Sequence, residues 1–341
     1  MSEVSMLSRF RGALVGVAIG DGMGMPVETM RHEAIMELNG GLGVIGFMNP
    51  IQTTFPEVRT LSRAATTDDW QLTAAVARSL IRSKGEFDLS DCTEEHVKEW
   101  RRDNRFWGGT SRKAIAEIVE GKREPSTPPV IIPGKSGLGN AIIMKISPLA
   151  LIGISAKPYW LMKKTWELGC MTHGDPRASI AAYAVATTMQ LVLEHGKTPT
   201  FPSGHQAFLQ WLLSEVEEME KFRADFSIDN ADQISARIAR ILPTLGDAES
   251  VRREIGCGFT SLETAPFAIA TYLRHQDDFR TGILEAVNAG GDTDSNASIV
   301  GGLIGATVGV RGIPPEWIAE CPAKDEAFEL ADELYACVEK Q

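Results

Sequence analysis

Glycine recurs at every fourth position in two apolar segments near opposite ends of the 341-residue chain. The repeats are Gly12, Gly16, Gly20 and Gly24 in the first segment and Gly301, Gly305 and Gly309 in the second. Residues four apart share one face of a helix, and glycine inside a helix costs about 1 kcal/mol relative to alanine. Repeated glycines therefore indicate close backbone packing, and we expect the two helices to contact each other. Their contact would bring Asp21 and Glu28 toward Asp292.

Two carboxylates and a hydroxyl stand immediately before the second of these helices. Asp292, Asp294 and Ser295 follow Gly290 and Gly291, which permit a sharp turn, and the apolar positions after them have helical spacing. A helix N-terminus could use one such residue as a cap. Two carboxylates two positions apart, however, repel each other unless a cation lies between them, so we favour a divalent-metal site over capping.

The spacing of these carboxylates also begins a calcium-binding EF-hand loop. Counted from Asp292, such a loop needs glycine at its sixth position and glutamate at its twelfth. The chain has Ala297 and Leu303 there, which excludes an EF-hand.

A second acidic cluster of the same design lies more than 200 residues earlier in the chain. Thr66, Thr67, Asp68 and Asp69 stand where a loop enters another apolar segment with helical spacing. The two clusters supply two sets of three oxygen ligands, namely Thr67, Asp68 and Asp69, and Asp292, Asp294 and Ser295. These sets could hold two octahedral cations roughly 3.5–4 Å apart and leave positions for water. Mg²⁺ and Mn²⁺ both accept such ligands, so the sequence leaves the choice between them open.

Five short motifs together resemble the ADP-ribosylglycohydrolase family, which includes the dinitrogenase reductase-activating glycohydrolases. The motifs are, in chain order, RGALVGVAIGDGMGMPVE, TTDD, GLGNAIIMKISPLAL, THGDP and GDTDS. They occur in the family's order and cover about residues 9 to 311. The resemblance implies metal-dependent hydrolysis of an N- or O-glycosidic bond to ADP-ribose or a related ribosyl group. The substrate would be an ADP-ribosylated protein or small molecule.

The resemblance also implies which residues contact the substrate. The central loop consists of Ser136, Gly137, Leu138, Gly139 and Asn140. Taken alone it is an ordinary flexible turn whose amide groups could hold a diphosphate, and the resemblance makes it a substrate loop. Two departures, Ala141 for the usual glycine and Lys145 for the usual arginine, leave a smaller or different ribosyl substrate open. His173 is by its position a structural residue before a helix, but it matches the family's substrate-contacting histidine.

The catalytic residues are predicted from the same two clusters and from the loop after the first helix. Asp69 and Asp294 would chiefly hold metal, while Glu28 would orient or deprotonate water. Asp21 is interpreted as a helix-end or turn residue. Gly108–Ser111, before Arg112, is a candidate loop at the pocket edge.

Apolar spacing elsewhere predicts an all-α chain of roughly a dozen or more helices. Helices are expected at 94–102, 111–121, 158–169, 176–195, 204–222, 230–242, 261–273 and 277–289. The strand-like run Val130–Ile132 is confined between prolines. No linker divides the chain, and the two clusters need each other, so residues 1–341 are predicted to form one compact domain with the metal site at helix N-termini.

Composition restricts the partners and the compartment. A net charge of −11 argues against nucleic acid or an anionic membrane as a general partner, but not against an anionic substrate. No apolar run is long enough to span a membrane. The N-terminal basic and apolar residues lack the features of a cleaved signal peptide, because Asp21 follows too soon. Five cysteines without paired spacing indicate reduced thiols and a cytoplasmic protein.

Two other functions are compatible with these residues. One is a metal-dependent hydrolase of other phosphorylated nucleosides or sugars. The other is a non-catalytic binding or structural member of the fold, as the family's crystallin relatives imply. The intact carboxylate clusters favour an enzyme, because four carboxylates without a cation would repel one another. The aglycone and the oligomeric state are left open.

Overall fold

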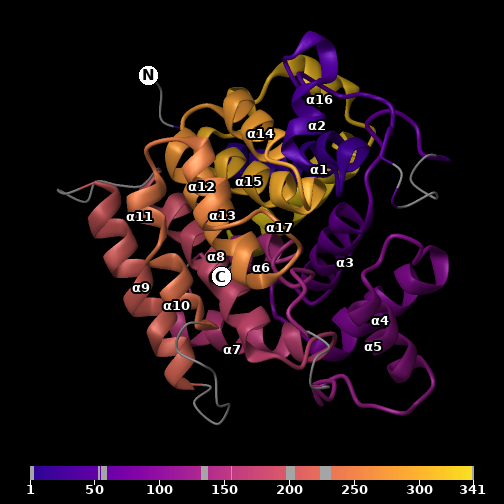
Figure 1. Ribbon diagram of the computed structural model, residues 1–341. Helices are drawn as coiled ribbons and strands as arrows, with labels where there is room; N and C mark the ends of the chain where they lie inside the picture. Colours follow the sequence, from indigo (N-terminus) through magenta and orange to yellow (C-terminus); the bar gives the residue numbers. More distant parts are fainter. Residues whose placement is uncertain are drawn as a thin grey trace.

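The computed structural model describes residues 4–52, 54, 60–131, 137–154, 156–196, 204–222 and 232–339. Within these ranges the chain is helical and contains no strand, apart from the isolated bridges Arg31–Gly290 and Gly139–Thr260. The predicted all-α class is confirmed (Figure 1). No helix in the described ranges is long and apolar enough to cross a membrane.

The first half of the chain contains a long glycine-rich helix, several short elements and five further helices. These are α1 (Met6–Gly24), η1 (Met25–Val27), α2 (His32–Met36), η2 (Leu38–Gly40), α3 (Asp68–Arg82), α4 (Leu89–Arg102), α5 (Gly109–Val119), α6 (Ser147–Ile152) and α7 (Pro158–Cys170). The second half contains α8 (Pro176–His195), α9 (His205–Phe222), α10 (Ile234–Ile238), α11 (Ile241–Thr244), α12 (Ala248–Glu254), α13 (Ser261–His275), α14 (Phe279–Asn288), α15 (Thr293–Val308), η5 (Val310–Gly312), α16 (Pro315–Glu320) and α17 (Lys324–Val338).

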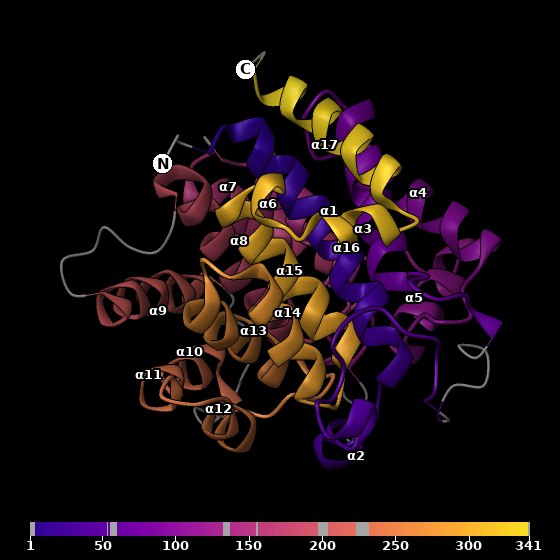
Figure 2. The ribbon, with the colours of Figure 1, turned by 90° about the horizontal axis from the view of Figure 1, so that it is seen from above.

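Helices α1 and α15 form the centre of the fold and lie side by side (Figure 2). Their glycine faces meet without intervening side chains. A methyl group added at Gly16 would lie 2.2 Å from the carbonyl oxygen of Gly301, and one at Gly305 would lie 2.0 Å from that of Gly12. These separations are shorter than any van der Waals contact, so only glycine permits the packing. The predicted contact between the two glycine faces is confirmed.

The other long helices surround this pair. Helices α8, α13 and α14 pack against α15, while α3 and α17 pack against α1 and against each other. Both central helices are buried around most of their circumference, which explains why their sequences are apolar on every face. This arrangement leaves the C-terminal end of α1 beside the N-terminus of α15, where the candidate site lies.

Most predicted helices are present, with shifted ends. Helix α4 begins at Leu89, because Asp88 accepts hydrogen bonds from the amides of Ser90 and Asp91 and so starts the helix earlier than apolar spacing shows. The helix predicted over 230–242 is wrong: the chain forms the short helices α10 and α11 there, and residues 230–231 lie outside the described part. Pro243 lacks the amide hydrogen that a continuous helix would need. Val130 and Ile131 form no strand, and Ile132 is not described.

Candidate metal centre

The two acidic clusters lie at the N-termini of α3 and α15, and these helix ends meet. Thr67 and Asp292 are the N-cap residues, and Asp68, Asp69 and Asp294 lie in the first turns. The hydroxyl of Ser295 on α15 donates a hydrogen bond of 3.3 Å to Oδ2 of Asp69 on α3. Residues that are more than 200 positions apart in the sequence therefore form one group, as the sequence predicts.

Gly290 and Gly291 form the turn that precedes α15, and Gly291 forms hydrogen bonds with the loop that contains Glu28. Gly290 and Gly291 have φ angles of +81° and +75°, which side chains rarely adopt. The amide of Gly291 donates to the carbonyl of Met30, and the amide of Thr29 donates to the carbonyl of Gly291 at 2.7 Å. The loop after α1 is thus held against the segment that leads to Asp292.

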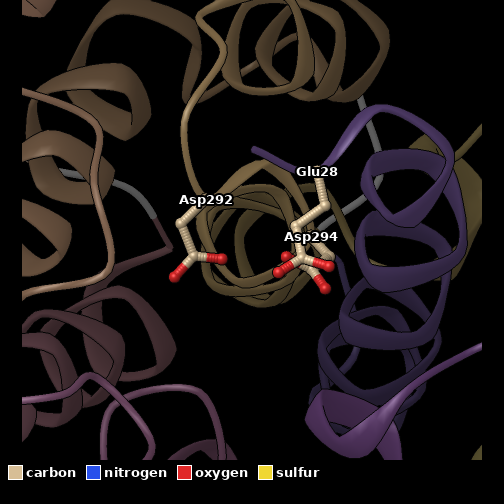
Figure 3. A group of neighbouring side chains, drawn as sticks. All are labelled: Glu28, Asp292 and Asp294. Carbon is tan, nitrogen blue, oxygen red and sulfur yellow. The ribbon is translucent and has the colours of Figure 1, made fainter. Parts of the chain in front are cut away.

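Glu28 joins the carboxylates of α15. One carboxylate oxygen from each of Glu28, Asp292 and Asp294 lies within 4.8 Å of the other two (Figure 3). Asp292 and Asp294 are buried, and Glu28 is half-buried. Among the described residues no lysine, arginine or histidine forms an ion pair with Glu28, Asp68, Asp69, Asp292 or Asp294. The group could hold a cation. The buried Lys145 acts on Asp68 through its charge but forms no ion pair with it.

Burial and the charges of neighbouring carboxylates favour the protonated forms of Glu28, Asp68, Asp69 and Asp294. Burial raises the pKa of Glu28 to about 9, and the charges of Asp292 and Asp68 contribute. Burial, then repulsion from Asp21, raises the pKa of Asp68 to about 8. The pKa values of Asp69 and Asp294 are also raised well above their usual range, chiefly by burial. A divalent cation would stabilise the ionised forms and so reverse these shifts.

The donor set fits a hard divalent cation. Oδ1 of Asp69 is buried and has no hydrogen-bond partner, so one acceptor at the centre is unsatisfied. Carboxylates and hydroxyls are the groups that Mg²⁺ and Mn²⁺ prefer. The side-chain amide of Asn140 donates to Oδ2 of Asp292 at 2.7 Å, which orients this carboxylate.

Asp21 holds the N-terminus of α3 in place. This residue lies inside α1, and its carboxylate accepts hydrogen bonds of 2.9–3.0 Å from the amide and hydroxyl of Thr67 and from the amide of Trp70. Burial raises its pKa to about 6, although these hydrogen bonds oppose the shift. Asp21 lies in the last turn of α1, so its interpretation as a helix-end residue is confirmed. Its capping of another helix was not predicted. The one sequence feature that could have indicated this role is an acidic residue within a buried, glycine-rich helix.

A pocket of about 750 Å³ opens beside the carboxylates. Its walls come from the two acidic clusters, the Glu28 loop, the segment 105–112, the segment 139–144, His173 and the segment 258–259. Of the predicted substrate residues, Gly139, Asn140 and His173 line it, whereas Gly137 and Leu138 do not. Ser136 lies outside the described residues.

The substrate loop is fastened to the segment before α13. The amide of Asn140 donates to the carbonyl of Phe259, and the amide and hydroxyl of Ser261 donate to the carbonyls of Leu138 and Gly139. The side chain of Asn140 is engaged with Asp292. Several polar groups of this loop are therefore already satisfied by the protein.

His173 reaches the pocket as a neutral group. Its Nδ1 lies 2.9 Å from the hydroxyl of Thr172, and burial, with the nearby charge of Lys145, lowers its pKa to about 3. Of the two sequence departures, Ala141 lines the pocket, whereas Lys145 is buried and does not. Burial lowers the pKa of Lys145 to about 8.

Sequence reasoning missed the aromatic groups of the pocket. Phe106, Trp107 and Phe259 line it, and the side chain of Phe259 is 63% exposed. An exposed aromatic residue between helices carries no periodic signal, so the sequence alone did not identify it. The expected pocket-edge loop, 108–111, does line the pocket.

The comparisons with known proteins identify the class. The family model "ADP-ribosylglycohydrolase" matches residues 2–341. "ADP-ribosylhydrolase ARH3" of Homo sapiens is 26% identical over 359 residues, covering 98% of this chain and 94% of its own. Its namesake from Danio rerio is 28% identical over 376 residues, covering 98% and 92%. A solved "ADP-ribosylglycohydrolase-related protein complex" has the same fold, with a TM-score of 0.66, 23% identity and coverage of 98% and 99%.

The chain belongs to the ADP-ribosylglycohydrolase family. The predicted family and the predicted class, a hydrolase of glycosyl bonds, are confirmed. The residues that hold metal or substrate stay a prediction.

Proposed function

We propose that the protein hydrolyses the glycosidic bond that links ADP-ribose, or a related ribosyl group, to a protein side chain or a small molecule. The observation that carries this proposal is the meeting of two helix N-termini, which place carboxylates without ion-pair partners among the described residues on the wall of a pocket of about 750 Å³. The family membership and the ARH3 relatives support the ADP-ribosyl group as the part that is released.

Two divalent cations, Mg²⁺ or Mn²⁺, would be held by the two helix ends. The ligands would be Thr67, Asp68, Asp69, Asp292, Asp294 and Ser295. Such cations would supply stabilisation of the charge that develops as the glycosidic bond breaks and would lower the pKa of a water molecule. The unsatisfied Oδ1 of Asp69 supports this assignment.

The protein's own groups would orient the reactants. Asp69 and Asp294 would act at the reacting centre chiefly as ligands. Glu28, whose carboxylate lies beside Asp292 and Asp294, would accept or return a proton at the attacking water. Asn140 would fix the Asp292 carboxylate through its hydrogen bond. His173 is neutral and would contact the substrate as a hydrogen-bonding group rather than as a cation.

The domain organisation, the compartment and the classes of partner complete the proposal. We propose a single domain over residues 1–341, because α1 and α15 join the two ends of the chain at its centre. The five free thiols support a reducing compartment, for which we propose the cytoplasm. The net charge of −11 supports neither nucleic acid nor an anionic membrane as a general partner.

The test is a mass-spectrometric screen of the purified protein, with Mg²⁺ or Mn²⁺, against ADP-ribosylated peptides and small molecules. Release of free ADP-ribose is expected, and chelation with EDTA should abolish it. Release of phosphate or of a simple nucleoside instead would identify a hydrolase of other phosphorylated nucleosides or sugars. No turnover of any ribosyl substrate would overturn the proposal in favour of a binding or structural protein.

Cation binding is tested separately by thermal unfolding. Either ion at about 100 times its Kd should stabilise the wild type by about 2.7 kcal/mol through mass action. The Asp294→Ala variant should lose most of this gain. A wild type whose melting temperature is unchanged by millimolar Mg²⁺ and Mn²⁺ would exclude the cation site.

A further inference from the structure

The segment 256–260, between α12 and α13, touches both parts of the candidate site, yet its own side chains do not fix its position. It belongs to no helix, and all of its residues are half-buried or exposed. Phe259 lines the pocket although its side chain is 63% exposed. A stretch without buried side chains has little packing to hold it. Its position therefore depends on hydrogen bonds.

The backbone of segment 256–260 is bonded to the start of α15 and to the substrate loop. The carbonyl of Cys257 accepts hydrogen bonds from the amide of Asp292 at 3.0 Å and from the side-chain amide of Asn296 at 2.8 Å. The carbonyl of Phe259 accepts one of 3.1 Å from the amide of Asn140. A shift of the segment would therefore move a proposed cation ligand and the pocket wall together.

The carboxylate of Glu263, in the first turn of α13, holds the middle of this segment. Its Oε2 accepts a hydrogen bond of 2.6 Å from the amide of Gly258. The hydroxyl of Thr264 donates to the carbonyl of Gly258 at 3.0 Å, and the side-chain amide of Asn140 donates to that hydroxyl at 3.2 Å. Both backbone groups of Gly258 are thus bound by α13.

Glu263 does not play the usual part of a glutamate at this position of a helix. Thr260 is the N-cap residue, and with Glu263 three residues later it matches a capping box, in which the glutamate binds the amide of the N-cap residue. The side chain of Thr260 forms no cap, and the Glu263 carboxylate bonds two residues further back, at Gly258. The carboxylate therefore holds the loop rather than the end of its own helix.

Two glycines leave room for this carboxylate. A methyl group added at Gly258 would lie 2.5 Å from Oε2 of Glu263, and one added at Gly256 would lie 2.8 Å from its carboxyl carbon. These separations are shorter than van der Waals contact, so a side chain at either position would displace the carboxylate. Gly256 also has a φ of +91°, which side chains rarely adopt.

We propose that Glu263 is a positioning residue. Through Gly258 it fixes segment 256–260, which orients Asp292 at the cation centre and places Phe259 on the pocket wall. The inference rests on the proposed function for the roles of cation and substrate, whereas the hydrogen bond that fixes the segment does not depend on it. Glu263 does not line the pocket, so its effect on binding passes through Cys257 and Gly258.

Two variants of the whole chain and one control test this role. Glu263→Ala removes the acceptor, whereas Glu263→Gln keeps an oxygen that accepts from the Gly258 amide and should restore wild-type behaviour. Glu285→Ala is the control for lost stability. Glu285 is also half-buried and hydrogen-bonded, to Arg274 and His275, but it does not line the pocket.

Hydrogen exchange measures the hold on the segment, and calorimetry measures its consequences. In Glu263→Ala the amides of segment 256–260 should exchange faster, and Mg²⁺ and, in saturating Mg²⁺, ADP-ribose should each bind about 10-fold more weakly. For an ADP-ribosylated peptide at saturating Mg²⁺, the loss should appear in KM more than in kcat. Glu263→Gln should bind both ligands as the wild type does. Glu285→Ala should do so too, although its melting temperature falls.

Gly258→Ala tests the same contact from the other side. Its methyl group should displace the carboxylate and weaken Mg²⁺ binding as Glu263→Ala does. In the double variant the second substitution should add nothing, because the contact is already lost. Additive losses would contradict the contact as the cause, since Gly258 also lines the pocket. If Glu263→Ala does not fold, Gly258→Ala with Glu263→Gln decides the point.

Faster exchange in Glu263→Ala with wild-type affinity for both ligands would overturn the proposal, because the segment would then be held without effect on the site. Losses in Glu263→Gln as large as those in Glu263→Ala would also overturn it. A wild type that binds Mg²⁺ but no ADP-ribose would refute the proposed function, while exchange and Mg²⁺ affinity would still decide the role of Glu263. A wild type that binds neither ligand would overturn both proposals.

Discussion

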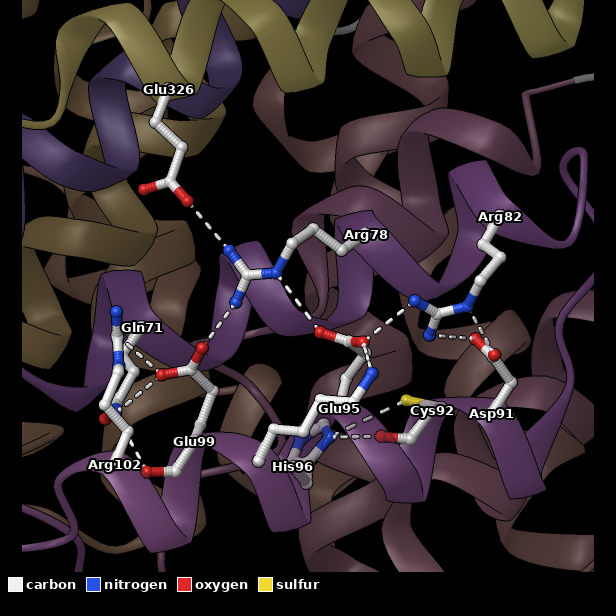
Figure 4. A network of polar contacts seen from close by, with 11 residues as sticks. Gln71, Arg78, Arg82, Asp91, Cys92, Glu95, His96, Glu99, Arg102 and Glu326 are labelled. Atoms are coloured by element: carbon white, nitrogen blue, oxygen red, sulfur yellow. Dashed lines mark hydrogen bonds and ion pairs between the residues drawn. The ribbon is translucent and has the colours of Figure 1, made fainter.

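One group of buried acids lies at the N-terminus of α3 and another lies beside its C-terminal half. The two groups differ in their ion pairs with basic side chains. At the N-terminus of α3, Asp68 and Asp69 meet the carboxylates of α15 with no ion pair to a basic side chain among the described residues. At its C-terminal half, Arg78 and Arg82 face Glu95 and Glu99 of α4 (Figure 4). Both groups are acidic and largely buried, so burial does not distinguish them. They differ in the counter-charge that the chain provides.

The acids of α4 are fully supplied with partners. Glu95 binds Arg78 at 3.2 Å, Arg82 at 2.9 Å and Lys98 at 2.7 Å. Burial alone would raise the pKa of Glu95, but the hydrogen bonds from Lys98, Arg82 and Arg78 outweigh burial and lower it. At the other end of α3 the pKa of Asp68 rises to about 8. Three cations thus surround one buried carboxylate of α4, whereas five carboxylates at the other end of α3 form no ion pair among the described residues. This difference supports the proposed cation centre.

The largest effect should come from removing two ligands of the proposed centre. We expect Asp68→Asn and Asp292→Asn each to reduce turnover by orders of magnitude, and the double variant to be only slightly worse than either. The reason is that groups acting on one shared centre are strongly non-additive, because the first substitution already destroys it. Steady-state turnover of an ADP-ribosylated substrate is the measurement.

Asp91→Asn, which removes a carboxylate that is bound to Arg82 on the paired side, is the control and should leave turnover unchanged. Additive losses in a folded double variant would mean that the two clusters are independent sites. Unchanged turnover in either single variant would remove that residue from the centre.

The second effect is a dependence of stability on pH in the absence of cations. Between pH 7 and 8 the acids of an unfolded chain are ionised, whereas Asp68 and Glu28, with pKa values of about 8 and about 9, still hold protons in the folded state. The folded protein therefore binds more protons, and its stability should fall as the pH rises, by about 1.4 kcal/mol per pH unit for each excess proton. Urea unfolding in EDTA at pH 7 and pH 8 measures this slope.

The Asp68→Asn variant should show a shallower slope, because one of the titrating groups is gone. Glu95 should contribute none of it, since its lowered pKa confines its contribution to more acidic solutions. With saturating Mg²⁺ the slope should approach zero, because the bound cation displaces these protons and the folded protein then binds no more protons than the unfolded chain. Stability that increases with pH in EDTA would contradict the raised pKa values.

The sequence predicted the elements of this comparison unequally. Glycine spacing was sufficient to predict that α1 contacts α15, because a face without side chains has few other uses in a buried helix. The repeated design of the two acidic clusters was sufficient to predict that they lie together, as the hydrogen bond from Ser295 to Asp69 shows. The glycine contact and the candidate centre could thus be predicted because each depends on a local sequence pattern that occurs twice in the chain.

Features that depend on a single contact between distant parts of the chain could not be predicted from the sequence. Asp21 caps α3 from within α1, and no spacing in the sequence links it to Thr67. The wall formed by Phe259 depends on how the segment before α13 pairs with the substrate loop. The helix predicted over 230–242 was wrong because apolar spacing continues across a break that Pro243 favours.

The third effect is a loss of stability on the paired side of α3. Glu95→Gln removes the charge that three cations share, and the side chain of Glu95 is only 6% exposed, so we expect a loss of about 1–3 kcal/mol. The matched variant Asp68→Asn should lose nothing in EDTA or should gain stability, because it removes an acid that folding buries and protonates at pH 7. Urea unfolding of both variants at pH 7 decides the point. If both variants lose stability equally, the two groups of acids do not differ in kind.

The smallest effect should come from one cation of the paired group. Lys98 binds Glu95 at 2.7 Å from three positions along the same helix, but its side chain is 59% exposed. Exposed pairs of this type contribute about 0.2–0.5 kcal/mol, and salt screens them. We therefore expect Lys98→Ala to reduce the free energy of unfolding by at most about 0.5 kcal/mol, with a smaller loss at high salt. Arg78→Ala should cost more, because Arg78 is 28% exposed and binds Glu95, Glu99 and Glu326. If Lys98→Ala lowers the free energy of unfolding as much as Glu95→Gln does, each of the three cations that bind Glu95 is required. The observed arrangement instead predicts redundancy there, because two arginines still neutralise Glu95 when Lys98 is gone.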